Sequence, residues 1–136
     1  MNIAIVGATG NVGRKILEVL EKKELAIDNL YLLASSRSAG SKINFNGNEH
    51  EVVDLETFDF SKVKITFFAA GGKISENFAE IAAKHSLVID NSSFYRMDPD
   101  VPLIVPQVNS DHLNNIKKNI IANPNCSTAQ LVIALK

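Results

Sequence analysis

The sequence contains a single cysteine, Cys126, and three histidines among its 136 residues. One cysteine excludes an internal disulfide and favours a reducing compartment. His50 and His112 have no partners at metal-ligand spacing, so no metal site is expected. The formal net charge of −1 also argues against nucleic acid or a membrane surface as a partner.

Long apolar segments are absent as well. No apolar run approaches the roughly 18 residues that a membrane-spanning helix requires. The N-terminus leads directly into Ile3-Ala4-Ile5-Val6, without the charged lead of a signal peptide. The chain is 46% hydrophobic and has the usual length of one domain. We therefore expect a soluble, cytoplasmic, single-domain protein.

Short apolar segments alternate with helical patterns along the chain. Strands are predicted near residues 3, 30, 65, 88 and 120, and the fully apolar segment 3–6 is typical of a central parallel strand. Residues 43–53 alternate around Asn46-Gly47, which predicts a surface hairpin with a type I′ turn. The predicted fold is α/β: a Rossmann-like, doubly wound, mostly parallel sheet with helices on both faces.

Two helices and one irregular segment complete this prediction. The prolines at positions 99, 102 and 106 predict an extended, partly irregular path without a helix. The apolar faces of the helices are predicted to comprise Val12, Ile16, Val19 and Leu20 after the first strand, and Ile74, Phe78, Ile81 and Ala82 after residue 72.

The first strand ends in a glycine-rich loop, residues 7–13, with the spacing G-x-x-G-x-x-G. This spacing is a variant of the dinucleotide-binding fingerprint. Gly7 would permit a tight turn, Gly10 would let backbone N–H groups approach a pyrophosphate, and Gly13 would let the helix pack on the strand. The alternative is that these glycines serve only a turn and close packing.

The second strand ends in Ser35-Ser36-Arg37-Ser38-Ala39-Gly40, where a protein that prefers NAD would carry an acid for the ribose hydroxyls. A guanidinium flanked by hydroxyls suits a 2′-phosphate instead, so the pattern favours NADP. A polar loop with a solvated arginine is the alternative. Ala70-Gly71-Gly72, after a later strand, either leave room for a cofactor or simply form a turn.

Cys126 lies between an apolar run that ends at Ala122 and another that starts at Ala129, which predicts strand, turn and helix. Unpaired N–H groups and the helix dipole in a first helical turn favour a thiolate. A lone cysteine is, however, more often a small buried hydrophobe. Arg96, in a polar loop after a strand, could hold an anion, although a lone arginine is more often solvated or salt-bridged.

Together these segments resemble the N-terminal part of the bacterial aspartate-semialdehyde dehydrogenases. The motifs occur in the order of that family and span nearly the whole chain. The glycine loop is shared with many enzymes, whereas the proline-rich and cysteine segments are specific together. The motifs are residues 7–13 and 35–40, Ala70-Gly71-Gly72, Asp90-Asn91-Ser92-Ser93, residues 98–103 and Pro124-Asn125-Cys126-Ser127-Thr128.

The resemblance implies an NADP-dependent oxidoreductase of lysine, threonine, methionine and diaminopimelate biosynthesis. Its substrates would be aspartyl 4-phosphate or aspartate semialdehyde with phosphate. The resemblance makes Cys126 the nucleophile, Arg96 a ligand of the substrate phosphate and Asn125 the residue that positions the acyl group. The cofactor would be bound by Gly7, Thr9, Gly10, Asn11, Val12, Ser35, Arg37, Ser38, Ala39, Ala70 and Gly71.

The resemblance also implies that residues 1–136 form an NAD(P)-binding domain without its catalytic and dimerisation partner. In the family, the general-base histidine, the arginine for the substrate α-carboxylate and the dimer-forming domain all follow the cysteine segment. We therefore expect these 136 residues alone to be inactive, and full-length members to form homo-oligomers.

Three other interpretations compete. The related N-acetyl-glutamyl-phosphate reductases share the glycine loop, but their cysteine usually lies in a Gly-Cys segment. A short-chain dehydrogenase needs Tyr-x-x-x-Lys, with a lysine four residues after the tyrosine. Four residues after Tyr31 stands Ser35, and four residues after Tyr95 stands Pro99. A non-catalytic nucleotide-binding module remains open.

Overall fold

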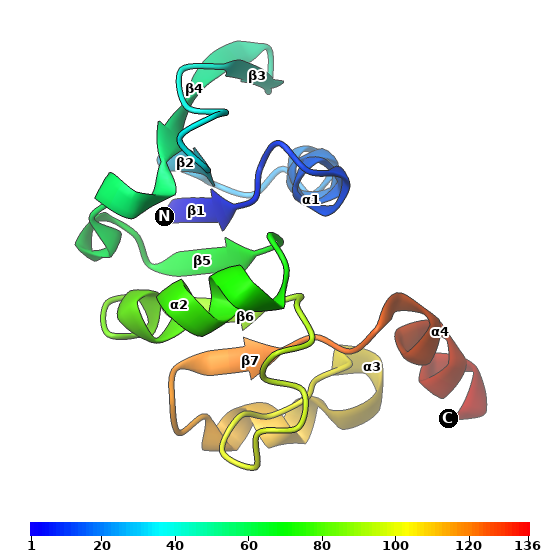
Figure 1. Ribbon diagram of the computed structural model, residues 1–136. Coiled ribbons are helices and arrows are strands. Elements are labelled where there is room, and N and C mark those ends of the chain that lie inside the picture. The colour runs from blue at the N-terminus through cyan, green and yellow to red at the C-terminus, as the bar shows by residue number, and fades with distance from the viewer.

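The computed structural model describes residues 1–136 (Figure 1). Strands, α-helices and short 3-10 helices follow one another along the chain. Their bounds are β1 (Asn2–Val6), α1 (Asn11–Lys22), β2 (Asn29–Ala34), β3 (Lys42–Phe45), β4 (Asn48–Asp54), η1 (Leu55–Thr57), η2 (Phe60–Lys62), β5 (Ile65–Phe68), α2 (Gly72–Ala83), β6 (Leu87–Asp90), α3 (Pro106–Asn109), η3 (Ser110–Asn115), β7 (Ile120–Ala122) and α4 (Cys126–Leu135).

One seven-stranded sheet organises the molecule, in the order β3-β4-β2-β1-β5-β6-β7 (Figure 1). Every neighbouring pair is parallel except β3 and β4. The chain adds β2 on one side of β1 and β5 on the other, so the strand order reverses at β1. A ligand crevice is expected at such a reversal, beyond the carboxyl ends of the strands. The predicted doubly wound α/β fold is confirmed.

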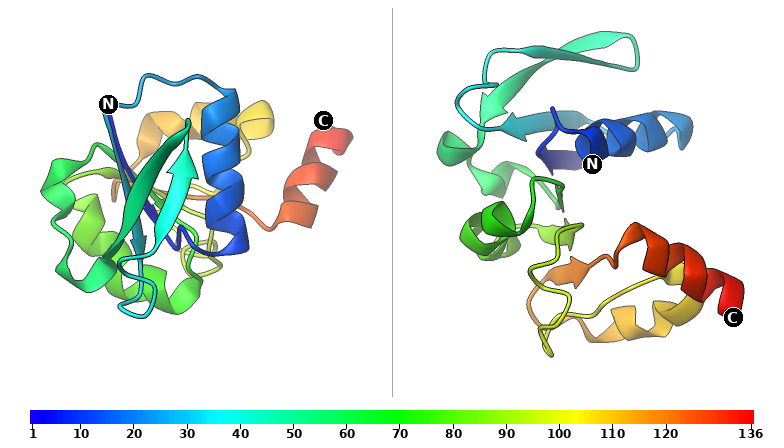
Figure 2. Two further views of the ribbon diagram at one scale, coloured as in Figure 1. Left: turned by 90° about the horizontal axis from the view of Figure 1, so that it is seen from above. Right: turned by 45° about the vertical axis from the view of Figure 1, so that its right-hand side comes forward.

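The two faces of the sheet bury alternate residues, as the two-residue period of a strand requires. Ile3 and Ile5 of β1 belong to one core cluster with Leu17 of α1. Ala4 and Val6 of the same strand belong to a second cluster, shared with α2. Figure 2 shows α1 and α4 on one side of the sheet and α2 on the other.

The predicted hairpin forms, but it does not lie apart on the surface. Asn46 and Gly47 have positive φ values of 49° and 77°, as a type I′ turn requires. β4 then pairs in parallel with β2, with Val52 opposite Leu32. Val52 is buried, as is Ile43 of β3. The alternating pattern predicts the hairpin itself. The pairing of the hairpin with β2 is a long-range contact, which no local pattern predicts.

The predicted apolar faces of the helices need correction. α1 buries Gly13, Leu17 and Leu20, whereas Val12 and Val19 are exposed. The buried stripe includes a glycine, which carries no apolar side chain and therefore escapes a hydrophobicity pattern. In α2, Ile81 is likewise exposed, and small residues around Ala79 pack on the sheet instead.

The prediction of no helix after the prolines is also wrong in one part. α3 begins at Pro106, which occupies the first helical turn. Proline is tolerated there because the N–H group that it lacks would have no partner within the helix. No helix in the structure is both long and apolar enough to cross a membrane.

Candidate active site

The loops that follow five parallel strands meet at one edge of the sheet. Gly7 follows β1, Ser35 follows β2, Ala69 follows β5, Asn91 follows β6 and Asn123 follows β7. Because these strands are parallel, their carboxyl ends all lie at this edge. The predicted cofactor and substrate residues therefore converge here, although they are scattered along the sequence.

The glycine loop is shaped by close backbone contacts. Gly7 has a φ of 85°, and a Cβ atom there would lie 2.8 Å from the carbonyl carbon of Ala69. A Cβ atom on Gly13 would overlap the carbonyl oxygen of Gly7. Gly10 is the N-cap of α1 and supplies no side-chain acceptor. The first N–H groups of α1 are thus left for an anion, as a dinucleotide site requires.

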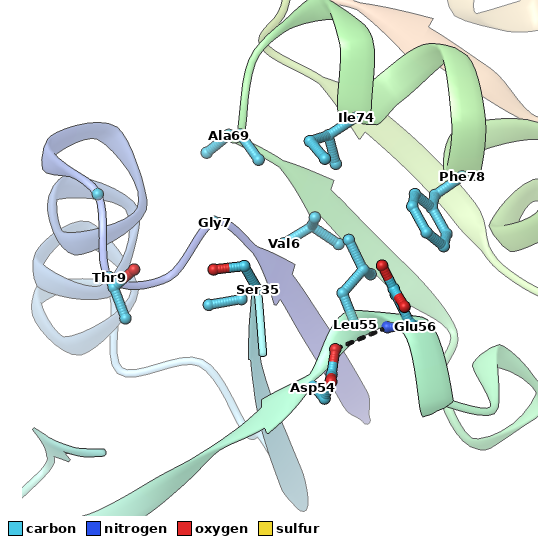
Figure 3. A pocket seen from close by; sticks show the side chains of 13 residues that line it. Val6, Gly7, Thr9, Ser35, Asp54, Leu55, Glu56, Ala69, Ile74 and Phe78 are labelled. Carbon is cyan, nitrogen blue, oxygen red and sulfur yellow. Dashed lines mark hydrogen bonds between the residues drawn. The ribbon is translucent and has the colours of Figure 1, made fainter. Parts of the chain in front are cut away.

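A cavity of about 440 Å³ lies between the ends of β1, β2 and β5 (Figure 3). Five of the predicted cofactor residues line it: Gly7, Thr9, Gly10, Ser35 and Ala70. Its position at the reversal of strand order and its mixture of backbone and apolar surfaces suit a nucleotide.

The sequence did not indicate the far wall of this cavity. Asp54 ends β4, Leu55 and Glu56 begin η1, and Ile74 and Phe78 come from α2 (Figure 3). Asp54 accepts a hydrogen bond from the backbone N of Glu56 at 3.1 Å, which caps η1. The hairpin was predicted to lie on the surface, so no pattern placed the end of β4 beside the end of β2.

The predicted 2′-phosphate residues form a turn beside the cavity. The backbone N atoms of Ser38 and Ala39 donate to the carbonyl oxygen of Ser35, at 2.9 and 3.2 Å. Ser35 and Arg37 are exposed, and Ser35 lines the cavity. Gly71, with a φ of 88°, is the N-cap of α2 and directly follows Ala70, which lines the cavity.

Cys126 is the first residue of α4, as predicted, and its thiol is exposed. Asn125 is the N-cap, and its side chain accepts a hydrogen bond from the backbone N of Ser127 at 2.9 Å. Cys126 lines a groove of about 480 Å³ that Asn11, Val12 and Asn91 also line. The thiol and the N-terminus of α1 thus share one groove.

Arg96 lies across the ends of β6 and β7. Its Nε donates to the carbonyl oxygen of Asn123 at 3.0 Å, and its Nη2 donates to that of Asn91 at 3.1 Å. The side chains of these two asparagines are also joined, because Asn123 Nδ2 donates to Asn91 Oδ1 at 2.5 Å. A guanidinium has five N–H groups, so three remain for an anion. Arg96 is thus fixed by backbone carbonyl groups, and its role in holding an anion stays a prediction.

The histidines lie elsewhere. His50 lines a small depression beside the hairpin, and His112 lines another near Pro99. His85 follows α2 at the opposite end of the sheet from the loops described above. No group of three or more His, Cys, Asp or Glu side chains is arranged to hold a metal ion.

Comparison with known proteins identifies the family of the chain. Residues 2–116 match the family model of the semialdehyde dehydrogenase NAD-binding domain. The chain belongs to the semialdehyde dehydrogenase family. An aspartate-semialdehyde dehydrogenase of Shewanella sp. (strain DB6705) is 49% identical over 99% of this chain and 40% of its own length. The resemblance inferred from the motifs is therefore confirmed.

Solved structures of semialdehyde dehydrogenases give the same result. A Vibrio cholerae aspartate-semialdehyde dehydrogenase II complexed with ASA superposes with a TM-score of 0.96, at 51% identity, over 99% of this chain and 45% of that chain. An aspartate-semialdehyde dehydrogenase with NADP from Candida albicans has a TM-score of 0.81 at 27% identity, over 100% of this chain and 46% of that chain. The chain spans less than half the length of these relatives.

Proposed function

We propose that this chain is the NADP-binding, nucleophile-bearing domain of an aspartate-semialdehyde dehydrogenase. One observation carries the proposal: Cys126, at the start of α4, shares a groove with the N-terminus of α1. An enzyme of this class needs its nucleophile beside the nicotinamide, and a dinucleotide bound at the N-terminus of α1 would extend toward the thiol within this groove. The relatives at about 50% identity that carry this enzyme name support the assignment. Nothing favours the alternative, an N-acetyl-glutamyl-phosphate reductase.

The proposed reaction begins at the exposed thiol. The thiolate of Cys126 attacks the acyl carbon of aspartyl 4-phosphate, phosphate leaves, and a thioester forms on Sγ. Bound NADPH would supply the hydride that adds to the thioester carbon, and cleavage of the C–S bond would then release aspartate 4-semialdehyde and return Cys126 as the thiolate. Arg96 would hold the departing phosphate with its remaining N–H groups, and Asn125 would position the acyl group.

The proposed cofactor contacts fall into two groups. The pyrophosphate would lie on the backbone N–H groups of Thr9 to Val12, and the base would enter the cavity between Leu55 and Phe78. Ser35, Arg37, Ser38 and Ala39 would surround the 2′-phosphate, with Ala70 and Gly71 opposite. The Candida albicans relative with NADP supports this choice of cofactor.

The carboxylate of Asp54 is the feature of the cavity that would favour NAD over NADP. Asp54 lines the cavity with Ser35, and a carboxylate there could instead bind the ribose hydroxyls of NAD. We assign it to capping η1, because it accepts the backbone N–H of Glu56. NADP preference then depends on Arg37.

The test is a titration of NADPH and NADH against the wild type and the variants Arg37→Ala and Asp54→Asn. Loss of charge-assisted bonds to the 2′-phosphate costs about 1.5–3 kcal/mol, so Arg37→Ala should weaken NADPH binding by about tenfold or more and leave NADH binding unchanged. Asp54→Asn, of matched size and located in the same cavity, should not weaken NADH binding. Equal affinity of the wild type for both cofactors would refute the assignment.

We also propose that these 136 residues alone do not turn over substrate. Proton transfer in this chemistry requires a positioned acid or base, usually a histidine, and no histidine lines the groove of Cys126. The base, the arginine for the α-carboxylate and the dimer contacts are expected in the part of the relatives that this chain does not span.

A further inference from the structure

The carboxylate of Asp90, the last residue of β6, is fully buried. Oδ1 accepts hydrogen bonds from Ser75 Oγ at 2.8 Å and from the backbone N of Ser92 at 3.0 Å. Oδ2 accepts from Ser92 Oγ at 2.7 Å. None of the ion pairs of the chain includes Asp90. A buried carboxylate held only by neutral donors is costly compared with an apolar residue of similar size, so its presence calls for a specific reason.

On one side, Asp90 is connected to the cofactor cavity. Ser75 lies in the first turn of α2, and its backbone N donates to the carbonyl oxygen of Gly71 at 3.2 Å. Ala70, just before this turn, and Ile74, within it, both line the cavity. The bond from Ser75 Oγ to Asp90 therefore fixes the start of α2 relative to β6, and with it one wall of the cavity.

On the other side, Asp90 is connected to Arg96. Ser92 donates to both oxygens of Asp90, and its Oγ accepts a hydrogen bond from the backbone N of Phe94 at 3.1 Å. These bonds fix the start of the turn that carries Arg96. The backbone oxygen of Asp90 also accepts from the backbone N of Asn123 at 2.8 Å, and the Asn123 carbonyl oxygen in turn holds Arg96 Nε.

We propose that Asp90 is a positioning residue. It holds the start of α2, beside the cofactor cavity, and the turn that carries Arg96 in one fixed arrangement. Ser75 transmits its effect to the cofactor side, and Ser92 transmits it to the anion side. The inference rests on the proposed function, because NADP and the anion-binding role of Arg96 are taken from it.

The test compares Asp90→Asn, Ser75→Ala and Ser92→Ala in the 136-residue chain. Three quantities are measured: the thermal midpoint, the dissociation constant of NADPH, and the ratio of the Cys126 alkylation rates with iodoacetate and iodoacetamide. Arg96 is bonded to Asn91, which lines the groove of Cys126, so a guanidinium fixed there favours the anionic reagent, and the neutral reagent corrects for exposure. The matched control is Ser86→Ala, because Ser86 is also a buried serine, bonded to Thr66 Oγ1 at 2.8 Å, away from both loops.

The two serine variants should separate the two effects. Ser75→Ala loses its one side-chain hydrogen bond, to Asp90, whereas Ser92→Ala loses both its bond to Asp90 and the bond from the backbone N of Phe94. Loss of one such bond corresponds to about a threefold to tenfold change. Ser75→Ala should weaken NADPH binding by this factor and leave the alkylation ratio unchanged. Ser92→Ala should lower the ratio and leave NADPH binding unchanged. Asp90→Asn should change both, whereas Ser86→Ala should change only the thermal midpoint.

The proposal is overturned if all three variants lower the midpoint as Ser86→Ala does and change neither binding nor the ratio. If Asp90→Asn does not fold, the two serine variants decide the question.

Arg96→Ala separates this inference from the proposed function. A wild-type ratio in Arg96→Ala refutes the anion role of Arg96. A lowered ratio in Arg96→Ala, with wild-type ratios in Asp90→Asn and Ser92→Ala, refutes only the role of Asp90. A wild type that does not bind NADPH refutes the cofactor assignment and the Ser75 half of the inference.

Discussion

Tyr95 lies in the core beneath the Arg96 turn and is 2% exposed. Burial, together with the nearby carboxylates of Glu80 and Asp90, raises its pKa from 10.0 to about 12. The folded state therefore keeps the phenol neutral at pH values where the unfolded chain releases the proton. This contribution to stability is fully present below pH 10 and is lost as the pH rises toward 12.

We expect Tyr95→Phe to remove this loss. Between pH 9 and pH 11, the unfolding free energy of the wild type should fall by about 1 kcal/mol relative to the variant. Urea titrations at both pH values measure the difference, with Tyr31→Phe as the control for removal of a tyrosine hydroxyl. The same pH dependence in wild type and Tyr95→Phe would contradict the expectation.

The sequence indicates the chemical role of a single residue more easily than it indicates the hydrogen-bond partners of that residue. Cys126 was placed in the first turn of a helix because apolar runs flank a proline-containing turn. For Arg96 the sequence left two readings open. Its partners are backbone carbonyl groups from two different strand ends, and backbone groups carry no sequence signal. The importance of Asn91, which joins the groove and this arginine, was missed for the same reason.

At the scale of the elements, α4 differs from the other long helices. It buries none of its residues, and Leu131 and Leu135 are 58% and 74% exposed. It lies beside α3, where Lys136 Nζ donates to the carbonyl oxygen of Gln107 at 2.5 Å. Figure 2 shows it projecting from the body of the molecule. A helix of this length has little stability of its own without tertiary packing.

We therefore expect the backbone amides of α4 to exchange with solvent about 100-fold faster than those of α2. α2 is the internal standard, because Ala79 and Ala82 are fully buried against the sheet. Hydrogen exchange followed by mass spectrometry resolves the two helices. Equal protection of α4 and α2 would show that α4 is held by contacts other than those described.

The elements themselves were largely predictable, because strands and helices leave local periodicities in the sequence. The errors arose where a local pattern is silent. Gly13 hides the buried stripe of α1 from a hydrophobicity pattern, and Pro106 starts a helix although proline usually ends one. The pairing of β4 with β2 is a long-range property that neither periodicity nor turn residues encode.

At the scale of the whole molecule, we propose that the active site also needs residues from the part of the relatives that this chain does not span. We expect the purified 136-residue chain to show no measurable reduction of NADP with aspartate semialdehyde and phosphate. Loss of a positioned acid or base alone costs about 10²–10⁴-fold in rate. The assay follows NADPH absorbance, with Cys126→Ser as the blank. Robust turnover that depends on Cys126 would mean that the base lies within these residues.

The place of β1 in the sheet has a consequence for synthesis. β1 leaves the ribosome before β2 and β5, yet it lies between them, and β5 ends at Phe68. One edge of this strand, which is apolar from Ile3 to Val6, therefore waits for a partner while about 60 further residues are made. At roughly 5–20 residues per second, that interval is about 3–12 s. During this time the nascent chain exposes an unpaired apolar edge, which is the surface that chaperones bind and that aggregation uses.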